Sequence, residues 1–324
     1  MATIVGSRIP LAGGPIIGIL IGTLISARKL GAKFQPGLAV AARFILQVSI
    51  VLLGAQVSLR QVLAVGIGSL PLMVGTLGTC LASAAYLGRR LGIARNLRTL
   101  VGVGTGVCGA SAIAAVTPVI GAADADVAFA VSTIFLFNVT AVLVFPILGH
   151  LFGLSQHSFG LLAGTAVNDM SSVVAASTTY GSVAANYAVV VKLTRTLLII
   201  PICLCLTTIE ARRDSRSATR AGTATVDFGR PRRGLGLRRF VPWFLIGFLV
   251  VTAANSAALI PTGARDPLRT LSVFLITMAL SAIGIGTDMA SFRRAGPRPL
   301  LLGGLLWLIV SGTSLVLQWV PGLL

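Results

Sequence analysis

The chain has 324 residues and a formal net charge of +18, carried by 26 Lys and Arg against 8 Asp and Glu. Charged residues make up 10% of the chain, against about 25% in ordinary soluble domains, and the mean hydropathy is +0.95. A soluble domain of this composition could not cover its surface with polar groups. The composition therefore excludes a cytosolic enzyme, a disordered chain and a disulfide-built secreted domain, and indicates a polytopic membrane protein.

Apolar stretches of about 20 residues, the length that crosses a bilayer core as a helix, recur along the chain. A strand barrel would instead need short alternating segments, so we predict an all-α membrane protein. The prediction is for ten transmembrane helices, near residues 11–27, 38–58, 62–88, 99–120, 127–149, 158–178, 184–208, 241–260, 268–289 and 299–320.

Basic residues gather in every second predicted loop. The loops after spans 1, 3, 7 and 9 hold nineteen Lys and Arg, whereas the other side holds four, together with the acidic pair Asp124 and Asp126. The positive-inside rule then places the richer loops, including 209–240, in the cytoplasm. The Arg residues are not interleaved with aromatic residues, so the sequence does not predict nucleic-acid binding.

The segment 209–240 divides the chain into a region with seven predicted spans, 1–208, and a region with three, 241–324. It is rich in Arg, Ser, Thr and Gly, and we interpret it as a partly disordered cytoplasmic linker. Its Arg residues are suited to contact anionic lipid head groups.

A weak internal similarity links spans 2 and 9. Each continues into a Gly-containing segment, starting at Gly54 and at Gly284, and each reaches a further Gly twelve residues on. These spans cross in opposite senses, as an inverted repeat of a secondary transporter would. Chance similarity between Gly-rich helices is the alternative.

The middle of span 4 is unusually rich in glycine, because four Gly occur between Gly102 and Gly109. Each interior Gly costs a helix roughly 1 kcal/mol relative to Ala, and unwound backbone is tolerated at membrane depth where it lines a cavity. An interrupted helix would aim free N–H groups at an anion. This predicts an anion site involving Gly106, Cys108, Gly109 and Ser111; close packing of an intact helix is the alternative.

Span 6 contains Asn168, Asp169, Ser171 and Ser172 within an apolar run. A carboxylate at membrane depth is a functional hypothesis by default because it is costly there. We expect Asp169, with Asn168 beside it, to balance a cation or to carry a coupling proton. A purely structural ion pair is the alternative.

Span 7 carries Lys192 and Arg195, which share a helix face at i and i+3. Two cations on one face within a membrane protein need an anion, which is Asp169, a substrate or both. The alternative is that both side chains reach an interface by snorkelling. Asn138, in the middle of span 5, is expected to bond across helices.

No catalytic constellation, metal site or cofactor site is predicted, and we expect the protein not to be an enzyme. The four Cys form no CxxC pair and only two His occur. No GxxxxGK[ST] sequence is found, so the energy source is expected to be an ion gradient.

Three runs carry a resemblance to a known family: Gly106–Ala115, Gly164–Ala176 and Val191–Arg195. Together with Pro242–Phe248 and Gly296–Leu300, they resemble the YeiH-type family of bacterial inner-membrane proteins, which carries the provisional name of a sulfate exporter family. The similarity runs in order over nearly the whole chain. It implies a multi-pass protein of the inner membrane.

The resemblance also implies a fold similar to bile-acid symporters and sodium/proton antiporters, with inverted repeats and crossed broken helices. The matching site positions are Cys108, Gly109, Ser111, Lys192 and Arg195. One departure matters: the family commonly has His-Glu where this chain has Asn168-Asp169. The acid is kept and the imidazole is lost, so a coupling scheme that needs a His proton does not transfer.

The leading hypothesis is a secondary transporter of a small anion, nominally sulfate or a sulfonate, held by Lys192 and Arg195 beside the interrupted helix. Two alternatives stay open: a cation/proton antiporter with Asp169 as carrier, and a non-transporting membrane scaffold or sensor that uses the Arg-rich loop. The expected partners are the anion and lipid head groups at 209–240, with a homodimer as an open alternative and no nucleic acid.

Overall fold

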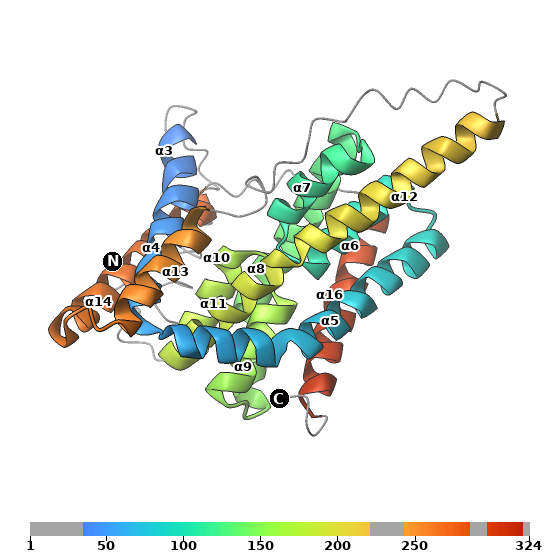
Figure 1. Cartoon of the computed structure of the whole chain (residues 1–324). Helices are drawn as coiled ribbons and strands as arrows, with labels where there is room; N and C mark the ends of the chain where they lie inside the picture. The colour runs from blue at the N-terminus through green and yellow to red at the C-terminus, as the bar shows by residue number, and fades with distance from the viewer. Residues whose placement is uncertain (1–34, 221–242, 286–296, 320–324) are drawn as a thin grey trace.

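The computed structural model describes residues 35–220, 243–285 and 297–319 (Figure 1). Throughout these ranges the regular elements are helices, which confirms the all-α prediction. The predicted span 11–27 and residues 221–240 of the linker lie outside the described residues.

Each predicted span after the first overlaps one or more helices of the described ranges. The bounds are α3 (Gln35–Val40), π-helix η2 (Ala41–Ile45), α4 (Leu46–Leu53), 3-10 helix η3 (Gly54–Gln56), α5 (Leu59–Arg90), α6 (Arg95–Gly106), α7 (Ala110–Ile120), α8 (Asp124–Leu151), α9 (Gln156–Ala166), α10 (Met170–Tyr180), α11 (Ser182–Leu197), α12 (Ile199–Arg220), α13 (Trp243–Ser256), α14 (Thr262–Ile285) and α16 (Pro297–Gln318).

Four stretches of helix are long and apolar enough to cross a membrane: Leu59–Arg90, Asp124–Leu151, Ser182–Glu210 and Pro297–Gln318. Their outer faces are apolar as well. On α5, for example, Leu63, Ile67 and Val74 are each more than half exposed. Large apolar side chains in such numbers on an outer surface are suited to lipid rather than water. The chain is a membrane protein.

The helices form two packed groups that draw on distant parts of the sequence (Figure 1). In one group, α3 and α4 pack against α13 and α14. Trp243 Nε1 donates to Gln47 Oε1 at 2.7 Å, and Ser272 Oγ donates to the Ser49 carbonyl at 2.8 Å. The other group contains α6 to α11 and α16, with α5 joining the two.

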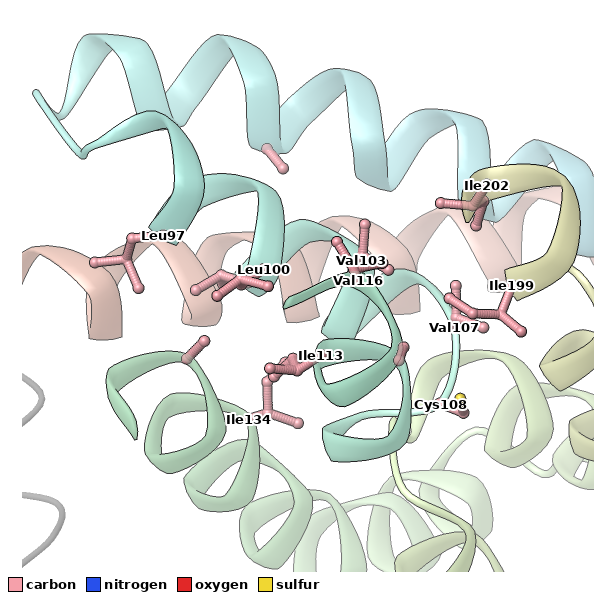
Figure 2. Packing of buried hydrophobic residues seen from close by; sticks show 14 of the residues in the cluster. Leu97, Leu100, Val103, Val107, Cys108, Ile113, Val116, Ile134, Ile199 and Ile202 are labelled. Atoms are coloured by element: carbon pink, nitrogen blue, oxygen red, sulfur yellow. The ribbon is translucent and has the colours of Figure 1, made fainter. Parts of the chain in front are cut away.

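Helices α6 and α7 form a hairpin rather than one spanning helix. A Cβ built on Gly104 would lie 3.0 Å from Ile113 Cδ1, although nine residues of continuous helix would separate them by about 13 Å. Figure 2 shows Val103 of α6 beside Val116 of α7 within one apolar cluster. The expectation that 99–120 crosses the bilayer is therefore corrected: the segment folds back on itself.

Helices α9 and α10 form a second hairpin, which corrects the same expectation for 158–178. Tyr180, at the end of α10, stacks on Phe159 at the start of α9 with ring centroids 3.8 Å apart. Gln156 Oε1 accepts from the backbone N–H of Val183 at 3.0 Å and of Ala184 at 3.2 Å. Both ends of this segment therefore lie at the same end of the bundle.

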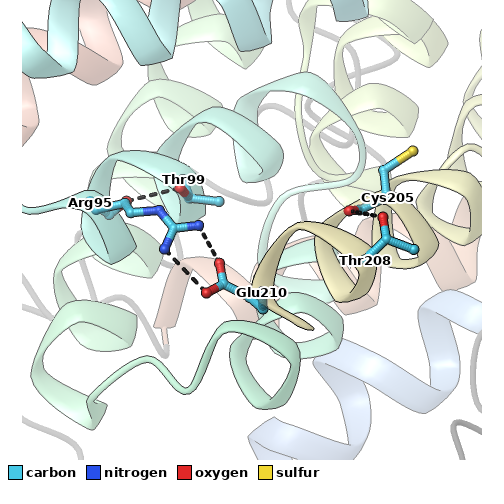
Figure 3. Close-up of polar contacts among 5 residues, drawn as sticks. All are labelled: Arg95, Thr99, Cys205, Thr208 and Glu210. Atoms are coloured by element: carbon cyan, nitrogen blue, oxygen red, sulfur yellow. Dashed lines mark hydrogen bonds and ion pairs between the residues drawn. The ribbon is translucent and has the colours of Figure 1, made fainter. Parts of the chain in front are cut away.

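The two hairpins enter from opposite sides, and α8 runs between them. Arg95, where α6 begins, forms an ion pair with Glu210 of α12 (Figure 3), whereas the second hairpin opens where α11 begins. Asp124 and Asp126, at the start of α8, thus lie on the side of Arg95. Their expected position on the opposite side is corrected.

Helix α12 continues to Arg220, so the first part of the expected linker, residues 209–220, is helical. The opposed hairpins 95–120 and 156–180 have the relation that an inverted repeat predicts. The expected repeat between spans 2 and 9 stays a prediction. The Gly284 side of that pair extends outside the described residues.

Candidate functional site

The tips of the two hairpins touch inside the bundle. We call residues 107–109 the first tip and residues 167–169 the second tip. A Cβ built on Gly109 would lie 3.6 Å from the carbonyl carbon and oxygen of Asn168. Figure 2 shows Val107 and Cys108 at the turn of the first hairpin. Irregular backbone at this depth is tolerated because protein surrounds it or a cavity adjoins it.

One glycine makes the first tip. Gly109 has φ +66° and ψ −131°, a conformation that a residue with a Cβ rarely adopts. The other glycines of the run serve close packing, because a Cβ on Gly102 would lie 2.6 Å from Ala84 Cβ and one on Gly106 would lie 3.0 Å from Leu77 Cδ1. The helix is thus interrupted at the first tip, as expected, while the glycines of α6 provide close packing; the anion site stays a prediction.

The second tip contains no glycine and is held by side chains. Asp169 is the N-cap of α10, where its Oδ2 accepts from the Ser171 N–H at 3.0 Å and from the Ser171 hydroxyl. Asn138 of α8 accepts from the N–H groups of Asn168 and Asp169, both at 3.1 Å, through its Oδ1. The expectation that Asn138 bonds across helices is confirmed.

Lys192 ties the two tips together. Its Nζ donates to the Val107 carbonyl at 2.7 Å and to the Val167 carbonyl at 2.8 Å. These carbonyls follow the last turns of α6 and α9, where the helix dipoles place partial negative charge. Lys192 is fully buried, so it is not an interfacial snorkelling residue.

Arg195 is buried just as completely but has no partner. Its Nε, Nη1 and Nη2 atoms make no hydrogen bond in the part of the chain that the structure describes. A guanidinium that stays unpaired in an apolar interior is costly, and an anion or water would relieve that cost.

Asp169 does not pair with either cation. The ion pair found among the described residues joins Arg95 and Glu210 instead. Asp169 lies at the positive N-terminal end of α10, and Lys192 lies at the negative C-terminal ends of α6 and α9. Each charge therefore compensates helix dipoles on its own side of the tips, which explains why the two remain apart.

A cavity of about 490 Å³ reaches the tips from the side of α7. It lies between the two helix groups, and its polar side chains, apart from Gln47, gather where the tips meet. The described residues that line it are Leu46, Gln47, Ile50, Ala110, Ser111, Ala114, Val131, Ile134, Phe135, Asn138, Asp169, Met170, Ser171 and Phe244.

The eight sequence-predicted site residues all lie at or around the tips, but only two line the cavity. Ser111 and Asp169 do so, whereas Lys192 and Arg195 lie behind the tips and Gly106 packs against α5. Asn138 and the lining residues of α4 and α13 were not predicted to bind a ligand. A polar residue in the middle of an apolar span was the available signal for Asn138.

Metal binding has no support among the residues that the structure describes, where no group of three His, Cys, Asp or Glu could hold an ion. The polar groups of the cavity are instead neutral donors and one carboxylate. These groups can bind a ligand by hydrogen bonds and by charge.

Comparison with known proteins assigns the family. The family model described as Conserved hypothetical protein 698 matches residues 1–303. The chain belongs to this family. The YeiH-type resemblance is thus confirmed.

Relatives match along nearly their whole length. A UPF0324 membrane protein from Streptococcus agalactiae serotype V is 39% identical over 324 residues, which cover 98% of this chain and 93% of the relative. A UPF0324 membrane protein from Fusobacterium nucleatum is 37% identical over 339 residues, which cover 98% and 94%. No solved structure matches the chain. These names describe membrane proteins and give no substrate.

Proposed function

We propose that this membrane protein is a secondary transporter that moves a small anion, with sulfate or an organosulfonate as the nominal substrate, across the bacterial inner membrane. The observation that carries the proposal is the cavity that ends at the tips of two opposed hairpins. Half-helix N-termini within the membrane are a recurrent way for transporters to hold anionic groups.

The charges around the tips favour an anion. Two basic side chains, Lys192 and Arg195, lie behind the tips, against the single carboxylate of Asp169. Helix α7 begins at the first tip without a side-chain cap, so its free N–H groups add partial positive charge. An anion in the cavity would be attracted by both contributions.

The cavity opens on one side of the tips, which supports alternating access. On the opposite side lie smaller cavities of about 110 Å³ and 180 Å³, near Gln56 and Asn186, and neither is lined by a tip residue. A transporter needs one state with access from one side and another state with access from the other. The cavity on the α7 side of the tips supports a state of the first kind.

The test is uptake into proteoliposomes that contain the purified full chain. Labelled sulfate and labelled alkanesulfonates are supplied separately, with and without a pH gradient. Saturable uptake that empty liposomes lack is expected. Well-folded protein that moves none of these anions would overturn the proposal.

A cation/proton antiporter is the second candidate, because Asp169 is the carboxylate that lines the cavity. In that case Asp169→Asn removes the pH dependence of cation exchange. The loop-based scaffold or sensor is separated from both by deletion of 212–233, which a transporter tolerates and a sensor does not.

A further inference from the structure

The size and lining of the cavity bear on what it holds. Its volume of about 490 Å³ falls in the range of roughly 300–1,000 Å³ that is typical of sites for organic molecules. The apolar part of the wall away from the tips is formed by Leu46 and Ile50 of α4, Val131 of α8 and Phe244 of α13. An inorganic tetrahedral anion would leave this wall unused.

Hydrogen-bond donors at the polar end point to an acid group. The first N–H groups of α7 lack intrahelical acceptors, and its N-cap, Gly109, has no side chain to supply one. The Ser111 hydroxyl lines the cavity beside them and makes no hydrogen bond within the described ranges.

Asn138 supplies a further donor, and its orientation is fixed. Two backbone N–H groups point at one of its amide atoms, so that atom must be the oxygen. The other atom is then the Nδ2 amide, which has no acceptor among the described residues. Asn138 is 3% exposed and lines the cavity. The Nδ2 group is therefore free to donate to a ligand in the cavity.

One acceptor stands beside these donors. Both hydrogen bonds from Ser171 go to Oδ2 of Asp169, and no donor to Oδ1 is found in the described part of the chain. The remaining carboxylate oxygen is therefore available to a cationic or donor group of a ligand in the cavity. A fully anionic ligand has no such group.

We infer that the transported molecule is a zwitterionic organic acid with a short apolar body. Its acid group binds the N-terminus of α7, Ser111 and Asn138, its ammonium group binds Asp169, and its alkyl chain lies on the wall formed by α4 and α13. This inference rests on the proposed transport function and narrows its substrate.

The test compares three kinds of probe in the same proteoliposomes: inorganic sulfate, alkanesulfonates of two to four carbons, and ω-aminoalkanesulfonates of the same lengths. A hydrogen bond between two charged groups corresponds to about a tenfold gain in binding affinity. The best aminoalkanesulfonate is therefore expected to have a KM about tenfold below that of the unsubstituted sulfonate of equal length, and sulfate is expected to be the poorest substrate.

Asp169→Asn is the matched variant. Asn is as good an N-cap as Asp, so α10 is expected to keep its start while the negative charge is lost. The ratio of the KM values for the plain and the amino compound of equal length is expected to fall from about ten to about one, and this ratio is the readout whatever the variant's absolute rate of uptake. Thermal shift of the purified variant with each probe gives the same comparison without transport.

The outcomes separate the two proposals. Uptake of sulfate or plain sulfonates with no gain from the amino group, or a gain that Asp169→Asn leaves unchanged, overturns the zwitterion and keeps the transporter. Absence of uptake and of binding for every probe, with folded protein, overturns both.

Discussion

Lys192 and Arg195 lie one turn apart on the same face of α11, both without exposed surface, yet only Lys192 has hydrogen-bond partners among the described residues. Lys192 holds the carbonyls at the ends of two half-helices, whereas the Arg195 guanidinium has no acceptor. The two cations on this face therefore contribute differently to stability, and substitution of each one distinguishes their contributions.

Replacement of Lys192 by Met is expected to destabilise the protein. It removes two hydrogen bonds from a charged donor, each worth about 1.5–3 kcal/mol, and leaves two buried carbonyls without partners. Arg195→Met removes a buried unpaired charge, which is costly in an apolar interior, and is expected to be neutral or stabilising. Thermal denaturation in detergent, followed by size-exclusion chromatography, measures both. Equal destabilisation by the two variants would contradict this division of roles.

Asn138→Asp is expected to keep the fold and weaken anion transport. The carboxylate still accepts from the two backbone N–H groups of the second tip, but it offers no N–H to the cavity and brings negative charge to it. The matched variant Asn138→Leu loses the acceptor as well and is expected to cost about 1–3 kcal/mol of stability for each unsatisfied N–H group. Uptake and thermal denaturation are measured for both. Normal uptake by Asn138→Asp would remove Asn138 from the ligand site.

Gly109→Ala is expected to cost about 1–3 kcal/mol because the first tip requires a conformation that suits glycine, and to abolish uptake. The control is Gly68→Ala on α5, where an added Cβ meets nothing within 4 Å. That variant is expected to gain up to about 1 kcal/mol from helix propensity. A Gly109→Ala protein with the wild-type denaturation midpoint would argue against the turn.

Sequence patterns located the helices well because bilayer-length apolar runs depend only on hydropathy. The same patterns could not reveal the hairpins, since an apolar run of twenty residues is equally compatible with crossing and with folding back. The loop charges did not help either. With two hairpins that enter from opposite sides, α8 is the only helix that crosses in the direction opposite to the ten-span prediction. Every basic loop therefore stays on its predicted side. Of the residues that carry a full charge, only Asp124 and Asp126 change side, and acidic residues contribute little to orientation.

The site was predicted in part for a similar reason. Asp169, Lys192 and Arg195 stand out from an apolar background, and Gly109 belongs to a conspicuous glycine cluster. The partners of the charged side chains could not be predicted. These partners are helix ends at the two tips, and the sequence places the tips sixty residues apart. The lining from α4 and α13 consists of ordinary apolar residues, which carry no local signal of a cavity.

The hairpin topology makes a prediction of its own for cysteine labelling. In a background from which Cys80, Cys108, Cys203 and Cys205 have been replaced, single cysteines are introduced by Ala122→Cys, Ser155→Cys and Ser182→Cys. A membrane-impermeant maleimide is then applied to oriented vesicles from either side. The second hairpin places Ser155 and Ser182 on one side, and the first hairpin places Ala122 on the other.

Ten crossing helices predict a different pattern, with Ala122 and Ser182 labelled from the same side and Ser155 from the opposite one. The two topologies differ at two of the three positions, so the assay does not depend on knowing which side is cytoplasmic. Labelling after detergent permeabilisation controls for buried sites. Modification of Ala122→Cys and Ser182→Cys from the same side would show that residues 95–120 cross the bilayer and would remove the opposed tips on which the candidate site is built.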